Sequence, residues 1–172
     1  MADVTLILGG ARSGKSSFAE RLIEAFNLRP IYVATAEPGD AEMRARIEAH
    51  RARRGPAWRT VEEPLDLAAT LEHEASPDTA VLVDCLTLWL TNIMLAERDV
   101  AEQVEALVQM LARLDGPVVL VSNEVGQGVV PANALARAFV DHAGRLHQDV
   151  ATVAGTVWLV AAGLPLRLKP AS

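Results

Sequence analysis

The stretch Leu6-Ile-Leu-Gly-Gly-Ala-Arg-Ser-Gly-Lys-Ser-Ser17 decides the fold of this chain. It matches the phosphate-loop pattern G-x-x-x-x-G-K-[ST], with Gly9, Gly14, Lys15 and Ser16 at the defining positions. A glycine-rich turn lets several backbone N–H groups approach phosphate oxygens, and the following helix adds its positive dipole end. Lys15 would add a charge near the β- and γ-phosphates, and the Ser16 hydroxyl is placed to bind Mg²⁺. The stretch therefore predicts a nucleoside triphosphate site.

The residues on both sides of this loop agree with that interpretation. Val4–Leu8 is an apolar run suited to a buried parallel strand, and Ser17–Phe26 has the spacing of an amphipathic helix. The alternative is a glycine-serine turn that merely contains a lysine. We favour the phosphate loop because strand, loop and helix occur in the order that the motif requires.

Further apolar strands alternate with helical patterns along the rest of the chain. We expect strands over residues 30–35, 58–62, 79–84, 117–122, 155–162 and 164–168, and helices over 41–52, 65–71, 86–96, 100–114 and 132–151. Strands that are apolar throughout indicate a sheet buried on both faces. The predicted fold is α/β, of the phosphate-loop NTPase type and RecA-like, with a mainly parallel sheet between helices. We expect one domain over residues 1–172.

Composition excludes several classes of function. The 172 residues are 51% hydrophobic with a formal net charge of −6, which disfavours general nucleic-acid binding. No apolar run is long enough to span a membrane, and the N-terminal residues lack the pattern of a signal peptide. The single cysteine, Cys85, cannot form an intramolecular disulfide, and we interpret it as a small buried residue. We therefore expect a cytoplasmic protein.

Two other positions are candidates for chemistry. Asp84 ends an apolar strand, where phosphate-loop enzymes hold magnesium; alternatively it caps the helix that follows. His50 lies in a helix rich in arginine, which is either a solvated basic surface or a site where a neutral imidazole attacks a phosphorus atom. The default interpretation of Glu62 is surface charge. We interpret His73, His142 and His147 as surface or core-edge residues.

Several segments together resemble one family. They are Gly9-Gly-Ala-Arg-Ser-Gly-Lys-Ser16, Ala34-Thr-Ala36, Glu42-Met43 with Arg46-Ile47 and His50-Arg51, Trp58-Arg-Thr60 with Glu62, and Asn123-Glu-Val-Gly126 with Val130-Pro131. In this order they resemble the bifunctional adenosylcobinamide kinase and adenosylcobinamide-phosphate guanylyltransferase of cobalamin biosynthesis. The resemblance covers about Thr5 to Lys169.

The resemblance implies two reactions. In the first, the aminopropanol hydroxyl of adenosylcobinamide takes the γ-phosphoryl group of ATP or GTP. In the second, GTP transfers GMP to adenosylcobinamide phosphate through a guanylyl-histidine intermediate, giving adenosylcobinamide-GDP and pyrophosphate. His50 matches the covalent histidine. Relatives of this kind form trimers, and the helix around Trp89 and Met94 would then have a subunit surface to cover.

The same resemblance implies the site residues. His50 and Lys15 are the catalytic pair, and Ser16 and Asp84 hold Mg²⁺. The nucleotide contacts are Gly9, Gly10, Ala11, Arg12, Ser13, Gly14, Lys15, Ser16, Ala34, Thr35, Ala36, Arg51, Ala52, Arg53, Arg54, Glu62 and Asp84.

The residues alone leave two other functions open. One is a plain small-molecule kinase in which His50 is a surface residue, and the other is a nucleotide-switched binding protein. The preferred phosphoryl donor, the general base of the kinase step and the residues that hold the corrin ring are also undecided by the sequence.

Overall fold

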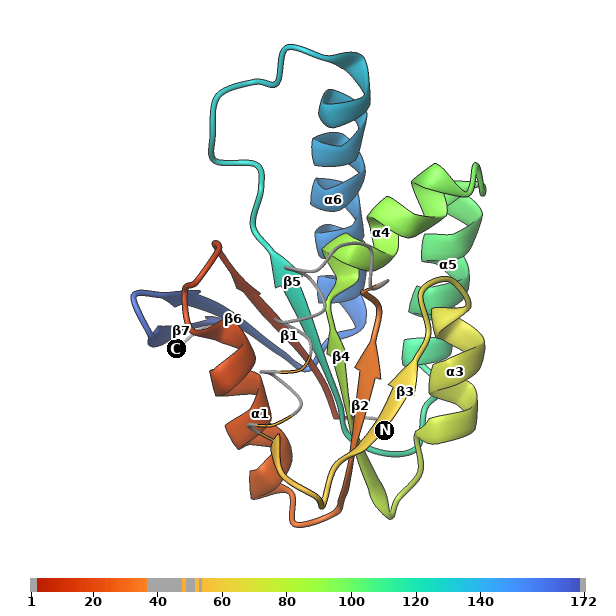
Figure 1. Cartoon of the computed structure of the whole chain (residues 1–172), viewed down its shortest axis with the longest axis vertical. Coiled ribbons are helices and arrows are strands. Elements are labelled where there is room, and N and C mark those ends of the chain that lie inside the picture. Colours follow the sequence, from red (N-terminus) through yellow and green to blue (C-terminus); the bar gives the residue numbers. More distant parts are fainter. Residues whose placement is uncertain (1–2, 37–47, 49–51, 53, 171–172) are drawn as a thin grey trace.

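A computed structural model describes residues 3–36, 48, 52 and 54–170. Its centre is a seven-stranded sheet in the order β3-β2-β4-β5-β1-β6-β7, parallel except for the antiparallel pair β6 and β7 (Figure 1). The strands are β1 (Val4–Gly9), β2 (Arg29–Ala34), β3 (Arg59–Glu62), β4 (Thr79–Asp84), β5 (Val118–Asn123), β6 (Thr156–Ala161) and β7 (Leu164–Lys169). The described helices are α1 (Lys15–Ala25), α3 (Leu67–Glu74), α4 (Leu86–Leu95), α5 (Val100–Leu111) and α6 (Ala134–Val153).

Helices cover the two faces of the sheet unequally. α1 packs on one face through Ala19 and Ile23, against side chains that include Ile7 and Val121. α3, α4, α5 and α6 pack on the opposite face and contribute most of the larger apolar core (Figure 1). Because both faces are buried, the central strands are apolar at nearly every position.

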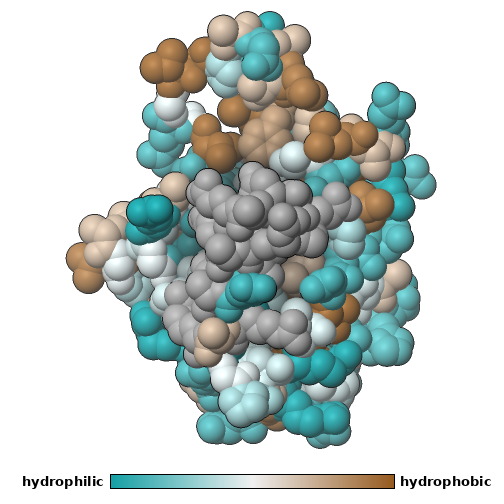
Figure 2. All heavy atoms as spheres, in the orientation of Figure 1, coloured by the Kyte–Doolittle hydropathy of each residue, from teal (hydrophilic) through white to brown (hydrophobic). Residues whose placement is uncertain are grey.

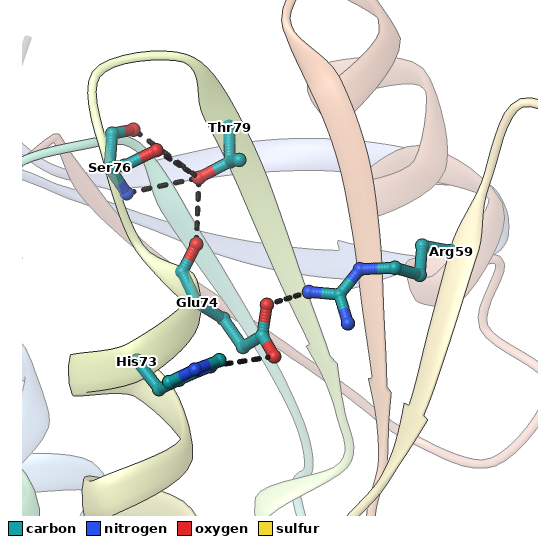
Figure 3. Close-up of polar contacts among 5 residues, drawn as sticks. All are labelled: Arg59, His73, Glu74, Ser76 and Thr79. Atoms are coloured by element: carbon teal, nitrogen blue, oxygen red, sulfur yellow. Dashed lines mark hydrogen bonds and ion pairs between the residues drawn. The ribbon is translucent and has the colours of Figure 1, made fainter.

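A polar cluster lies at the end of the sheet where β2 and β4 begin (Figure 3). The buried Glu74 carboxylate at the end of α3 forms an ion pair with Arg59 of β3, and its other oxygen lies 3.2 Å from Nδ1 of His73. The Thr79 hydroxyl accepts from the backbone N–H of Ser76 at 3.0 Å and lies 2.8 Å from the backbone oxygen of Glu74. The cluster therefore ties α3 to both neighbouring strands.

The sheet and helices confirm the predicted architecture, with ends that differ by a few residues. The parallel α/β sheet with helices on both faces is present, and β4 has the predicted bounds. Most of the helix expected over residues 41–52 lies outside the described residues. Within the described part of the chain, no helix is both long and apolar enough to cross a membrane.

Two side chains named in the sequence analysis lie in the core of the chain. Trp89 is buried in the core of its own chain, and its Nε1 donates to the backbone oxygen of Leu65 at 2.9 Å. The subunit surface expected for the helix around Trp89 and Met94 stays a prediction. His147 agrees with the core-edge alternative, because it is buried between α6 and β5. Both side chains make contacts with distant segments, which helical spacing does not reveal.

Exposed apolar side chains concentrate in two places. The loop between β5 and α6 projects from the molecule (Figure 1), and 96% of Val129 and 77% of Val130 are exposed. Figure 2 shows hydrophobic residues at the top of the molecule, where this loop lies. The edge strand β7 exposes Leu164, Leu166 and Leu168. Leu95 at the end of α4 is also exposed, and these described surfaces are where a large apolar partner would find contact.

Candidate active site

The predicted site residues come together because parallel strands end at the same edge of the sheet. Gly9 ends β1 beside Asn123, the last residue of β5. On the other side of β4, Ala34 lies in register with both Glu62 of β3 and Asp84 of β4. Five neighbouring strands therefore deliver polar residues and a glycine loop to one edge, where ligands bind in open α/β sheets.

The phosphate loop between β1 and α1 has little space around its first glycine. A Cβ on Gly9 would lie 2.5 Å from the Ser13 Oγ and 2.6 Å from the backbone oxygen of Val160. Gly14 has φ 95°, a left-handed conformation that favours glycine, and it immediately precedes α1. The backbone N–H of Gly163, in the β6–β7 turn, donates to Ser13 O at 2.8 Å. The end of β6 and the β6–β7 turn therefore support the conformation of the loop.

Lys15 begins α1 and its side chain is largely buried at the loop. The ammonium donates to the backbone oxygen of Gly10 at 3.0 Å, so it folds back over the turn that it follows. The first turn of α1 contains no acidic residue, so the helix itself supplies no carboxylate at the positive end of its dipole. This arrangement is suited to an anion held between the loop and the ammonium group.

Asp84 does not cap the following helix. The N-cap of α4 is Cys85, and no side chain makes a capping hydrogen bond there. Asp84 shares its sheet face with Ala34 and Tyr32, the face that α1 covers. Burial, and secondarily the Asp84 charge, raises the pKa of the adjacent Cys85 thiol, while Lys15 lowers it. The acid, the thiol and the loop lysine are therefore electrostatic neighbours.

A buried network fixes the backbone beside Asp84. The Thr35 hydroxyl accepts from Cys85 N–H and lies within 2.8 Å of Cys85 O. The Thr87 hydroxyl lies 3.2 Å from the Cys85 sulfur and accepts from Asn123 Nδ2 at 2.9 Å. Asn92 Nδ2 donates to Thr35 O at 2.8 Å. These contacts join the ends of β2, β4 and β5, so hydrogen bonds fix the backbone that carries Asp84.

Arg54 has a different environment from that expected of a basic surface helix. Only 8% of the residue is exposed, and its guanidinium carbon lies 3.4 Å from the centroid of the Tyr32 ring. Its Nη1 forms an ion pair with Oε1 of Glu20 at 3.9 Å, beyond hydrogen-bond distance. Nε and Nη1 make no hydrogen bond. A buried cation with two unused donors is prepared to accept an anionic ligand.

The remaining predictions divide between described and undescribed residues. Ala36 and Glu62 lie at the same sheet edge, and Glu62 is exposed. Ala52 is exposed and helical. His50, Arg51 and Arg53, which carry the proposed covalent step and part of the cationic cluster, lie outside the described residues.

The donor set at the edge fits magnesium. The Ser16 hydroxyl and the Asp84 carboxylate are partly accessible oxygen donors, and no described group of three or more His, Cys, Asp or Glu residues could form a metal cage. Mg²⁺ is usually held by one or two protein oxygens together with phosphate oxygens and water. Two protein oxygens therefore suit a Mg²⁺ ion that binds together with a nucleotide.

Sequence reasoning missed Tyr32, Glu20 and the network around Thr87. The alternation of β2 could have placed Tyr32 on the face of Ala34 and Asp84, since residues two apart share a face. Nothing in the sequence indicates that Arg54 lies on its ring.

Comparison with known proteins identifies the family. The family described as cobinamide kinase / cobinamide phosphate guanyltransferase matches residues 5–168. The chain belongs to this family. It is 54% identical over 166 residues to the bifunctional adenosylcobalamin biosynthesis protein CobP of Pseudomonas aeruginosa, covering 95% of this chain and 96% of the relative. It is 40% identical over 179 residues to CobU of Salmonella typhimurium, covering 95% and 98%.

Solved structures similar to this cobinamide kinase / guanyltransferase family member agree on the fold. A Pyrococcus horikoshii protein, solved as project PH0250, is 10% identical with a TM-score of 0.56 and covers 99% of this chain and 87% of its own. The flagellar accessory protein FlaH of Methanocaldococcus jannaschii is 11% identical with a TM-score of 0.50, covering 91% and 70%. The phosphate-loop NTPase fold is confirmed, and the chain is an enzyme of a bifunctional family.

Proposed function

We propose that the chain phosphorylates the aminopropanol hydroxyl of adenosylcobinamide and then transfers GMP from GTP to the resulting phosphate. The observation that carries this proposal is the gathering of the phosphate loop, Ala34, Glu62 and Asp84 at one sheet edge. This edge occurs in a chain 54% identical to a bifunctional adenosylcobalamin biosynthesis protein over nearly its whole length. We propose that residues 1–172 carry both activities as one domain.

In the proposed kinase step, the substrate hydroxyl oxygen attacks the γ-phosphorus of ATP or GTP. The new O–P bond forms as the bond to the bridging oxygen breaks, the nucleoside diphosphate leaves, and the hydroxyl proton passes to a base. Lys15 would turn from Gly10 O to the phosphate oxygens, where its charge is worth more in a water-poor site. The helix N-terminus at Gly14–Ser16 would bind the same oxygens.

In the proposed guanylyl step, an imidazole nitrogen of His50 attacks the α-phosphorus of GTP and pyrophosphate leaves. A phosphate oxygen of adenosylcobinamide phosphate then attacks the phosphorus of guanylyl-His50, which breaks the P–N bond and restores the imidazole. The covalent relay divides one displacement between two anions into two easier ones. Arg51, Ala52, Arg53 and Arg54 would contact the nucleotide, and the unused Arg54 donors support this assignment.

Ser16 and Asp84 would hold Mg²⁺, which neutralises phosphate charge when it is bound. The remaining proposed contacts are Gly9–Ser16, Ala34–Ala36 and Glu62. The close packing around Gly9 and the hydrogen-bond network beside Asp84 support these contacts, because both keep polar groups in place before a ligand binds.

We further propose a cytoplasmic homotrimer. The buried cysteine agrees with a reducing compartment, and the exposed side chains of Val129, Val130 and Leu135 offer apolar surface that a neighbouring subunit could cover. Sedimentation equilibrium tests the assembly directly. A mass of about one chain at micromolar concentration would contradict the trimer.

Incubation with α-labelled GTP and Mg²⁺ tests the covalent step. After denaturation, the wild-type protein should carry acid-labile, base-stable label, and His50→Ala should carry none. His73→Gln is the matched control, because His73 is an exposed histidine at the opposite edge of the sheet. An unlabelled wild-type protein that converts cobinamide would exclude the histidine relay. A protein that converts no cobinamide derivative would exclude the proposed function.

A further inference from the structure

One tyrosine connects the two charged groups of the proposed nucleotide site. Tyr32 lies in β2 with 7% of its surface exposed, and its side chain is on the face covered by α1. Ala34 shares that face and lies in register with Asp84 across the β2–β4 pair. Tyr32 and Asp84 are therefore on the same face of adjacent strands, near the end of the sheet that carries the phosphate loop.

The hydroxyl end of Tyr32 interacts with Asp84. Burial raises the pKa of the Tyr32 phenol, and the Asp84 carboxylate raises it further through its charge and as a hydrogen-bond partner, whereas the Arg54 cation lowers it in the same two ways. A neutral phenol is a hydrogen-bond donor, and a carboxylate is an acceptor. The phenol thus orients one carboxylate oxygen of the acid that we propose for Mg²⁺.

The ring of Tyr32 carries Arg54. The guanidinium carbon lies 3.4 Å from the ring centroid, closer than the 3.9 Å between Arg54 Nη1 and Glu20 Oε1. Nε and Nη1 make no hydrogen bond, so the Tyr32 ring and the ion pair with Glu20 are the described contacts that hold this cation in place. A planar guanidinium that lies over a tyrosine ring is held through its face, so the N–H donors at its edge stay available to other groups.

We propose that Tyr32 is a positioning residue of the nucleotide site, with its ring supporting Arg54 and its hydroxyl orienting Asp84. This inference rests on the proposed function, in which Arg54 contacts the nucleotide and Asp84 holds Mg²⁺. The two ends of one rigid side chain then set the separation of a cation and an acid. Substitution separates the hydroxyl from the ring, since Phe removes only the hydroxyl, with its interactions with Asp84 and Arg54, and Leu also removes the ring.

The first test isolates the hydroxyl by measuring GTP affinity against Mg²⁺ concentration. Tyr32→Phe should bind GTP within about twofold of the wild type in excess EDTA, because its ring still supports Arg54. It should need about three- to tenfold more Mg²⁺ to reach half of the metal effect on affinity. Thr152→Val is the matched control, because it removes an exposed hydroxyl at the end of α6. A folded Tyr32→Phe with the wild-type Mg²⁺ dependence would overturn the hydroxyl role.

The second test isolates the ring by a double-mutant cycle in EDTA. Tyr32→Leu and Arg54→Ala should each weaken GTP binding by about three- to thirtyfold. The double variant should bind GTP as tightly as the single variant with the lower affinity, because both changes remove the same contact. Losses that multiply would overturn the ring role. If Tyr32→Leu does not fold, Tyr32→Phe still decides the hydroxyl role, and Tyr32→Trp, which keeps an aromatic platform, should retain Mg²⁺-free affinity.

The outcomes separate this inference from the function on which it rests. A wild-type protein that neither binds GTP nor forms labelled His50 would contradict the proposed function. A wild-type protein that does both, with Tyr32 variants that behave like the wild type, would contradict the role of Tyr32 alone.

Discussion

The Ser122 hydroxyl and Nε2 of His147 lie 2.7 Å apart in the buried space between β5 and α6. Burial lowers the pKa of His147 below its ordinary value, and the Glu124 charge opposes part of that change. The folded state therefore holds the neutral imidazole, whereas the unfolded chain binds a proton more readily. This stabilisation is present above the unfolded pKa of about 6.5 and is lost as pH falls through the lower folded value.

We expect the free energy of unfolding to fall between neutral and mildly acidic pH, and His147→Gln to flatten that dependence. Urea unfolding followed by circular dichroism at several pH values measures the slope. His142→Gln is the control, because His142 is on the same helix but only partly buried. An unchanged slope in His147→Gln would show that another group is responsible.

Gly9→Ala should destabilise the protein by about 1–3 kcal/mol, because the new methyl group meets Ser13 and the Val160 backbone at less than van der Waals distance. Gly144→Ala should act oppositely and stabilise by about 0.5–1 kcal/mol, since it lies within α6 and its Cβ would meet open space. Thermal unfolding of both variants compares the two glycines directly. Equal melting temperatures would contradict the close packing around Gly9.

Glu74→Gln should lower the free energy of unfolding by about 1 kcal/mol, because it removes the charge that Arg59 and His73 approach from more exposed positions. The neighbouring Glu72→Gln changes an exposed carboxylate on the same helix and should have little effect. Denaturant titrations of the two variants give the difference. A larger loss in Glu72→Gln would contradict the structural role of this cluster.

Cys85 should react very slowly with iodoacetamide in the native protein. Burial, reinforced by Asp84, raises the pKa of its thiol, so the nucleophilic thiolate is scarce and shielded. Unfolding in urea should expose one reactive thiol per chain, which mass spectrometry counts. Rapid modification of the folded protein would show that the β4–α4 junction opens in solution.

Most of the fold was predictable because its elements are encoded locally. The phosphate-loop glycines, the apolar strands and the helical spacing each occupy a short segment, and the order of strand, loop and helix restricts the topology. The positions of Ala34, Glu62 and Asp84 at one edge then follow from parallel pairing. The first and last residues of the helices were less predictable, because fraying and capping at helix ends depend on neighbouring residues in the fold.

The sequence by itself determined the α/β class, the phosphate loop and, through its motifs, the family that the comparisons confirm. Only the tertiary structure decided that Arg54 lies buried on Tyr32, that His147 pairs with Ser122, and that Trp89 belongs to the core. The physical reason is that these contacts join residues far apart in the chain. Side-chain packing across elements selects them, and local propensity carries no information about which distant groups will meet.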